Sequence, residues 1–148
     1  MKILVIHGPN LNMLGKREKS IYGEKTLREI DALLKREARA LDVEVVTFQS
    51  NHEGSLIDFI QEQADSAQGI VINPGALTHY GLSLVDALSD TKLPVIEVHV
   101  SDIYHREEWR TKSVIAPIAE ERIIGLGWSG YITAMQTLVG KLKAKPSG

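Results

Sequence analysis

Apolar residues along this chain fall into short runs, separated by stretches in which they recur at helical spacing. Five of the runs are rich in β-branched residues and predict buried strands, at residues 3–6, 43–48, 69–73, 94–100 and 123–124. Strands that alternate with helices are joined by right-handed crossovers into a parallel sheet. The pattern therefore predicts an α/β fold in which helices cover both faces of a five-stranded parallel sheet.

The intervening helices carry recognisable start signals. Thr26 and Glu29 have capping-box spacing, which predicts that a helix begins at Thr26. Ser55 with Asp58 is expected to open the next helix in the same way. Two further helices are expected, at residues 82–88 and 128–144. A doubly wound, flavodoxin-like sheet is the natural closure for five such strands.

The remaining segments are interpreted as loops within one domain. Residues 8–25 are loop-like, because glycines flank Asn10 and Asn12 and a charged stretch follows. We find no repeat or internal linker, so residues 1–148 are expected to form a single domain. The tail, at about residues 143–148, is expected to be frayed.

Composition excludes several classes of protein. The chain has 17 Lys and Arg against 19 Asp and Glu, a net charge of −2, which disfavours a protein that coats nucleic acid. It has no cysteine, so disulfides, thiolate metal sites and a thiol nucleophile are excluded. The apolar runs are too short for a membrane span or a signal peptide. We therefore expect a cytoplasmic protein without a membrane partner.

Polar side chains follow three of the predicted strands, at the edge where doubly wound sheets bind ligands. They supply amide, guanidinium, phenol and imidazole groups, although loops are polar in any protein. These candidates are Asn10, Arg17 and Tyr22 after the first strand, Asn73 and His79 after the third, and His99, Ser101, Arg106 and Arg110 at the fourth.

His99 lies in an otherwise apolar strand, two residues after Glu97. Residues at this spacing share one face of a strand, so the carboxylate can hold one ring nitrogen and orient the imidazole. A histidine bonded to the backbone at the end of a strand is the structural alternative. On this pair alone, the functional and structural interpretations are about equally supported.

Tyr22 is a second candidate, although a solvated tyrosine in a loop is the commoner case. A phenol has an ordinary pKa of about 10 and is a poor base at neutral pH, unless about 4 kcal/mol of stabilisation favours the phenolate. Arg17 and Arg110 are the guanidinium groups that can supply it. A mobile segment with Arg17 and Tyr22 would close over a site and exclude water.

Arg106 and Arg110 share one face if their segment is helical. They are interpreted either as an anion-binding pair at the edge of the site or as part of a salt-bridged surface turn with Glu107 and Glu108.

Other motifs are weaker. The stretch from Gly125 to Gly130 matches a dinucleotide-binding fingerprint, but the acidic residue expected about 20 positions further on would fall at the end of the chain. It is interpreted as close backbone packing, and a flavodoxin-like nucleotide or flavin binding module remains the alternative function. A scaffold without catalytic activity is a third possibility. Histidine spacing gives little support for a metal site.

Several motifs together resemble one enzyme family over nearly the whole chain. The sequence resembles the type II 3-dehydroquinate dehydratase family. The matching stretches are Gly8–Gly15 with Arg17 and Tyr22, Gln49–Gly54, Asn73–Ala76 with Thr78 and His79, Asp86–Ala87, Glu97–Ser101 with Arg106 and Arg110, and Gly125–Tyr131.

The resemblance implies reversible dehydration of 3-dehydroquinate to 3-dehydroshikimate through an enolate, in the shikimate pathway that leads to aromatic amino acids. It implies that Tyr22 is the base, that Arg17 holds the phenolate, and that Asn10 stabilises the enolate oxygen through a water. His99 would be the acid, oriented by Glu97.

The resemblance also implies the binding groups and the assembly. The substrate would be held by Asn73, His79, Arg110, Val100 and Ser101. Asp86 would reach the site of a neighbouring subunit in a trimer, and four trimers would form a dodecamer. The family implies neither metal nor cofactor.

Overall fold

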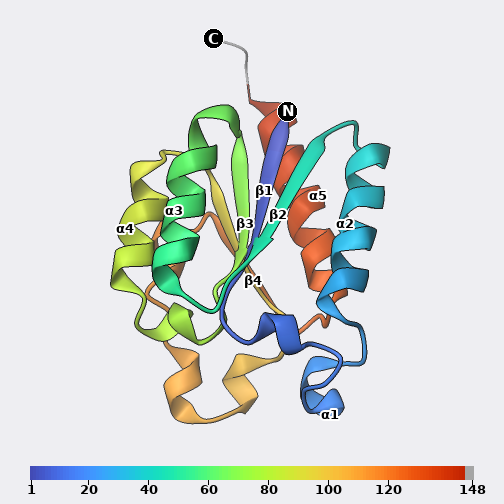
Figure 1. Ribbon diagram of the computed structural model, residues 1–148, viewed down its shortest axis with the longest axis vertical. Helices are drawn as coiled ribbons and strands as arrows, with labels where there is room; N and C mark the ends of the chain where they lie inside the picture. The colour runs from blue at the N-terminus through green and yellow to red at the C-terminus, as the bar shows by residue number, and fades with distance from the viewer. Residues whose placement is uncertain (146–148) are drawn as a thin grey trace.

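The computed structural model describes residues 1–145 and places five strands in one parallel sheet (Figure 1). The strands are β1 (Lys2–His7), β2 (Glu44–Gln49), β3 (Gly69–Asn73), β4 (Val95–His99) and β5 (Glu121–Ile124), in the order β2-β1-β3-β4-β5. This is the flavodoxin-like order. β2 is added on one side of β1 and the later strands on the other side, so the switch point of the sheet lies between β1 and β3. The predicted fold is confirmed. The bounds of β3 match the prediction, and those of the other four strands differ from it by one or two residues.

Helices cover both faces of the sheet, as the alternating pattern predicts (Figure 1). α2 (Leu27–Ala40) and α5 (Ser129–Ala144) pack on one face, over a core that contains Ile3, Val5 and Val98. α3 (Glu53–Gln63) and α4 (Leu82–Asp90) pack on the other, over a core that contains Leu4 and Ile72. Because β1 and β3 are buried on both faces, their sequences are continuously apolar rather than alternating.

Helix starts follow the predicted signals in one case and depart from them in another. The Thr26 hydroxyl accepts from the Glu29 amide and the Glu29 carboxylate accepts from the Thr26 amide, so the capping box is confirmed. The predicted start of α3 at Ser55 is wrong, because the helix already begins at Glu53. Glu53 instead accepts a hydrogen bond from the amide of Leu84, in the first turn of α4, at 3.0 Å.

The connections at the carboxyl ends of the strands contain short helical turns. Residues 8–25, predicted as loop, contain α1 (Lys19–Tyr22) and the 3₁₀ turn η1 (Leu11–Met13). Leu11 and Leu14 are buried and fasten this segment to the core. The other 3₁₀ turns are η2 (Ala64–Ser66), η3 (Gly75–His79), η4 (Ile103–His105), η5 (Glu108–Thr111) and η6 (Ala116–Ile118).

The two connections on either side of the switch point interlock. Gly8 donates its amide to the Asn73 carbonyl at 2.7 Å, and a Cβ at Gly8 would overlap the Pro74 carbonyl oxygen. Gly75 faces the Pro9 carbonyl from the other side, with a positive φ of 60°. Glycine is required at both positions because no side chain fits between the two backbones.

The last helix extends further than predicted. Lys143 and Ala144 belong to α5, and Lys143 Nζ donates to the Leu41 carbonyl at 2.9 Å, so the expectation of fraying from residue 143 is wrong for these two residues. The remaining part of the predicted tail, residues 146–148, lies outside the described residues. Within residues 1–145, none of the helices has the length and apolar character needed to cross a membrane.

Replacing Gly8 with alanine is expected to destabilise the fold. The new methyl group would force the connection after β1 away from Pro74, so we expect a loss of about 2–3 kcal/mol in the free energy of unfolding, measured by urea titration. Gly140→Ala is the matched control, because a Cβ at Gly140 meets nothing within 4 Å. As a helical position it should gain roughly 0.5–1 kcal/mol. Equal stability of Gly8→Ala and wild type would contradict the interlock.

Candidate active site

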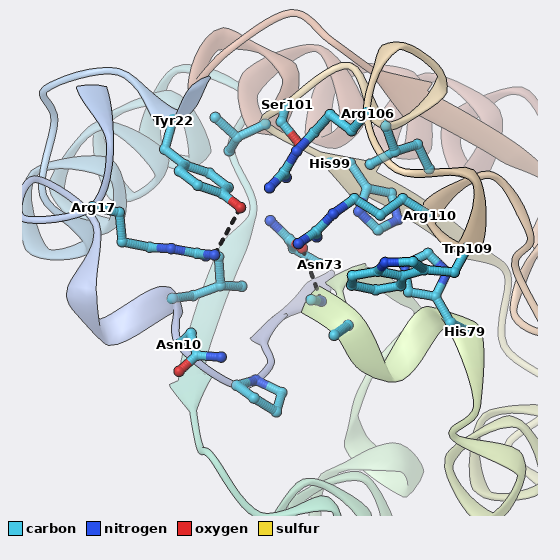
Figure 2. Close-up of a pocket in the computed structure, with 16 residues that line it drawn as sticks. Asn10, Arg17, Tyr22, Asn73, His79, His99, Ser101, Arg106, Trp109 and Arg110 are labelled. Atoms are coloured by element: carbon cyan, nitrogen blue, oxygen red, sulfur yellow. Dashed lines mark hydrogen bonds between the residues drawn. The ribbon is translucent and has the colours of Figure 1, made fainter. Parts of the chain in front are cut away.

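A cavity of about 230 Å³ lies beyond the carboxyl ends of β1, β3 and β4. Figure 2 shows Arg17 and Tyr22 on one side of it and His79, Trp109 and Arg110 on the other. The structure brings together most of the site residues that the sequence predicted. Those lining the cavity are Asn10, Arg17, Tyr22, Asn73, His79, His99, Val100, Ser101 and Arg110.

Arg17 and Tyr22 form a close pair. An Nη of Arg17 lies 2.7 Å from the Tyr22 hydroxyl, and its guanidinium carbon lies 3.7 Å from the centre of the phenol ring. The pairing follows from α1, which ends at Tyr22 and turns the ring inward against the core, so Tyr22 is not a solvated loop residue. A guanidinium can only donate hydrogen bonds, so the phenol oxygen is the acceptor and negative charge on it would be stabilised.

Arg106 is a second cation at the same ring. Its guanidinium carbon lies 5.1 Å from the centre of the Tyr22 ring, and it donates to the Ser101 hydroxyl at 3.3 Å. The condition for Arg106 and Arg110 to share a helical face is not met, because Arg106 has an extended backbone between η4 and η5. Two separate turns, rather than one helix, place both side chains at the cavity.

His99 and Glu97 form the predicted dyad at the end of β4. His99 Nε2 lies 2.5 Å from a Glu97 carboxylate oxygen, and both side chains are buried, with exposures of 6% and 0%. A carboxylate only accepts, so Nε2 carries a hydrogen and Nδ1 is the other ring nitrogen available for proton transfer. His99 therefore bonds a carboxylate side chain through Nε2, which favours the functional interpretation over a histidine bonded to the backbone.

Glu97 has further partners that the sequence pattern did not identify. Thr78 donates to it at 2.5 Å, Ser113 at 3.0 Å and Arg122 at 3.1 Å. Burial alone would raise the pKa of Glu97, but the hydrogen bond and charge of His99, with Thr78 and Arg122, outweigh it and lower this pKa from 4.5 to about 2. Glu97 is therefore a fixed negative charge behind His99. Distant residues such as Ser113 and Arg122 give no local signal of this role.

The opposite wall is built from His79, Trp109 and Arg110. His79 Nδ1 donates to the Lys112 carbonyl at 2.6 Å, which leaves its other ring nitrogen for a ligand. The Trp109 ring meets His79 edge to face at 5.1 Å, and the Arg110 guanidinium lies 4.1 Å from the Trp109 ring centre. Arg110 also forms a salt bridge with Glu107 and lines the cavity. It therefore belongs both to a salt-bridged surface turn and to the site, the two interpretations that the sequence offered. Sequence reasoning missed Trp109.

Asn10 and Asn73 come from the interlocked connections. Asn10 has a left-handed backbone, with φ 70°, and its amide donates to the side-chain oxygen of Asn51 at 2.9 Å. Gly75 donates its amide to the Asn73 side-chain oxygen at 3.1 Å (Figure 2). The backbone that carries Asn10 and the backbone that carries Asn73 are therefore each fixed by hydrogen bonds and by contact with the other connection.

Asp86 is the one predicted site residue that stands apart. It lies in α4, whereas the residues lining the cavity come from other segments. Within a single chain, the structure does not bring Asp86 to the site.

The cavity has an excess of positive charge. Arg17, Arg106 and Arg110 line it, and none of its lining residues in the described part of the chain is acidic. Such a site suits an anionic ligand. Residues 1–145 contain no group of three or more His, Asp or Glu arranged to hold a metal ion.

The glycine-rich turn between β5 and α5 serves packing, as predicted. A Cβ at Gly130 would lie 3.3 Å from a methyl group of Val98, and Gly125 and Gly127 donate to the carbonyls of His99 and Val100. The turn supports the end of β4 from behind and is not part of the cavity lining.

The fold and site together define an α/β enzyme that pairs an arginine-bound phenol with a carboxylate-bound imidazole. The profile of the family "Dehydroquinase class II" matches residues 1–139, and the chain belongs to this family of hydro-lyases. The sequence is 61% identical over 140 residues to the 3-dehydroquinate dehydratase of Roseiflexus castenholzii, covering 95% of this chain and 89% of that protein.

Solved structures give the same result. The type II dehydroquinase of Butyrivibrio crossotus superposes with a TM-score of 0.91 at 47% identity, covering 93% of this chain and 97% of that one. The type II dehydroquinase of Propionibacterium acnes gives 0.90 at 40% identity, covering 94% and 96%. The family resemblance inferred from the sequence motifs is confirmed.

Glu97 is expected to make stability depend on pH in the acid range. Because its pKa is lowered from 4.5 to about 2, the ionised carboxylate stabilises the fold above pH 4.5, and this contribution is lost as the pH falls toward 2. The shift corresponds to roughly 3 kcal/mol. In urea titrations, the stability advantage of wild type over Glu97→Gln should therefore shrink by about this amount between pH 5 and pH 2.

Glu44→Gln is the control for this titration, because Glu44 is an exposed residue on β2. Its difference from wild type should stay nearly constant with pH. A constant offset for Glu97→Gln as well would show that the buried carboxylate is not the acid-sensitive group.

Proposed function

We propose that residues 1–148 act as one catalytic domain that dehydrates 3-dehydroquinate reversibly to 3-dehydroshikimate, within the cytoplasm and the shikimate pathway. The observation that carries the proposal is the pairing of Arg17 with Tyr22 and of Glu97 with His99 around one cationic cavity, in a chain of the dehydroquinase family. The reaction needs a base, an acid and an anion-binding wall, and the cavity lining supplies groups suited to each.

In the proposed first step, the Tyr22 phenolate removes a proton from the carbon next to the substrate ketone. The electron pair moves onto the carbonyl oxygen and forms an enolate. Arg17 supports this step because its hydrogen bond to the phenol oxygen stabilises the ionised base. Asn10 would hold a water that donates to the enolate oxygen.

In the second step, the enolate collapses, the bond to the β-hydroxyl breaks, and His99 supplies the proton that lets it leave as water. The Glu97 carboxylate fixes the imidazole and stabilises its protonated form, while Nδ1 transfers the proton. Tyr22 is left protonated and His99 deprotonated, so proton exchange with solvent restores both groups for the next turnover.

Substrate binding is assigned to the remaining polar groups. Arg110 and His79 are proposed to hold substrate oxygens on the wall next to Trp109, and Asn73 binds a substrate hydroxyl from the floor. The backbone amides of Val100 and Ser101, with the Ser101 hydroxyl, would bind the carboxylate.

We also propose a trimer that assembles further into a dodecamer, with Asp86 completing the site of a neighbouring subunit. This assignment rests on the family resemblance and on the position of Asp86 in α4, outside its own cavity.

The purified protein is expected to convert 3-dehydroquinate into a conjugated enone, which is followed by its ultraviolet absorbance. Because the proposed mechanism uses neither a metal nor a lysine imine, the rate should be unchanged by EDTA and by borohydride added with substrate. Tyr22→Phe and His99→Ala should each lower kcat by about 10²–10⁴, because each removes a proton-transfer group.

Tyr80→Phe is the matched control, since it removes a phenol hydroxyl from an exposed side chain outside the cavity. It should keep wild-type turnover. No absorbance change from correctly folded wild type would refute the dehydratase proposal, and undiminished turnover in Tyr22→Phe would refute the role of the base.

The proposed assembly is tested by sedimentation and by activity in mixed subunits. We expect a dodecameric mass, and we expect Asp86→Ala to lower kcat/KM by about tenfold or more without changing that mass. Mixing Asp86→Ala with Tyr22→Phe subunits should restore activity in sites that combine an intact Tyr22 with an intact neighbouring Asp86. A fully active monomer would refute the proposal.

A further inference from the structure

A buried chain of polar side chains, not used by the proposed mechanism, runs from α2 to the floor of the cavity. His7 ends β1 and Tyr131 lies in the first turn of α5, and both are 0% exposed. His7 Nδ1 lies 2.9 Å from the Tyr131 hydroxyl, and His7 Nε2 lies 2.8 Å from a carboxylate oxygen of Asp31 in α2. Burying His7 and Tyr131 is costly unless their polar atoms have hydrogen-bond partners, and partly buried Asp31 supplies one of these partners.

This series of polar side chains reaches the cavity through Asn73. His7 and Asn73 are register partners at the ends of β1 and β3, so their side chains lie side by side on the face that α2 and α5 cover. Burial raises the pKa of the Tyr131 phenol, and the neighbouring Asn73 side chain opposes this rise. Asn73 is 2% exposed yet lines the cavity, so its amide connects the buried chain with the ligand space.

Hydrogen-bond chemistry gives this chain a direction. The Asp31 carboxylate only accepts, so His7 Nε2 donates to it, and Nδ1 accepts from the Tyr131 hydroxyl when the ring carries only this one hydrogen. The Tyr131 oxygen keeps lone pairs free, and the NH₂ group of Asn73 is the neighbouring donor that could use one of them. The other end of the Asn73 amide is already fixed, because its oxygen accepts from the Gly75 amide at 3.1 Å.

We propose that Asp31, His7 and Tyr131 are positioning residues that fix the Asn73 amide so that it presents an N–H, and not its oxygen, to the ligand. An NH₂ group has two hydrogens, and Tyr131 takes one of them, so the second is directed to a substrate oxygen. The site thereby selects an acceptor at this point, such as a hydroxyl lone pair or a carbonyl oxygen. The inference rests on the proposed function for the identity of the substrate, but not for the orientation of the amide.

The test is a double-mutant cycle between Tyr131 and Asn73. Tyr131→Phe removes one hydroxyl and keeps the ring in the core. We expect it to lower kcat/KM for 3-dehydroquinate about tenfold, mainly by raising KM, because the Asn73 amide loses the partner that orients it. In an Asn73→Ala background, the same substitution should change kcat/KM less than about twofold, since its effect passes through the missing amide.

Val139→Ala is the matched control, because Val139 is buried on the same helix and in the same core layer as Tyr131. It should leave kcat/KM unchanged in both backgrounds, which separates a positioning effect from a general loss of packing. Equal losses from Tyr131→Phe in both backgrounds, or no loss in either, would overturn the inference.

The failure of this inference differs from the failure of the proposed function. An inactive wild-type enzyme would refute the proposed function and leave the amide orientation open to direct observation. A crystal structure of Tyr131→Phe then decides: a rotated Asn73 side chain supports the inference, and an Asn73 side chain in its original position, with its contact to Gly75 intact, overturns it.

Discussion

The buried carboxylate of Glu97 is the interaction on which the rest of the site depends. It accepts from His99 on its own strand, from Thr78 in the connection after β3, and from Ser113 and Arg122 further along the chain. An unpaired carboxylate in this position would be costly to bury, so the fold is held to the arrangement that supplies all these donors. The wall that carries His79 and Arg110 is thereby tied to the strand that carries His99.

The same carboxylate separates charge across the site. Negative charge is placed behind His99, away from the cavity, while the guanidiniums of Arg17, Arg106 and Arg110 line the cavity itself. Charges in a cavity walled by protein act more strongly than in water. The arrangement therefore attracts an anionic ligand to the cavity, while the negative charge of Glu97 stays on the far side of His99.

The sequence predicted the fold because each layer leaves a local signal. Buried parallel strands are continuously apolar, and the capping box before α2 spans four residues. It also predicted Glu97 as the partner of His99, because their relation depends only on strand geometry. The start of α3 was misjudged because Ser55 and Asp58 have the spacing of a capping box inside a helix that has already begun.

The partners that sequence reasoning missed are those whose role depends on long-range packing. Ser113 and Arg122 meet Glu97 only because the chain returns beside β4, and Tyr131 meets His7 across 124 positions. Arg106 and Arg110 have the spacing of a shared helical face, yet they reach the cavity from two separate turns. Spacing rules do not describe contacts of this kind, because tertiary packing alone brings the residues together.

The interlock of Gly8 with Pro74 and of Gly75 with Pro9 has a mechanical consequence. The connections that carry Asn10 and Asn73 share one surface of backbone contact, so neither can move without displacing the other. The two connections that form the floor of the cavity therefore act as one rigid unit. A side chain added at either glycine would displace the facing proline segment, and with it the connection that carries the other asparagine.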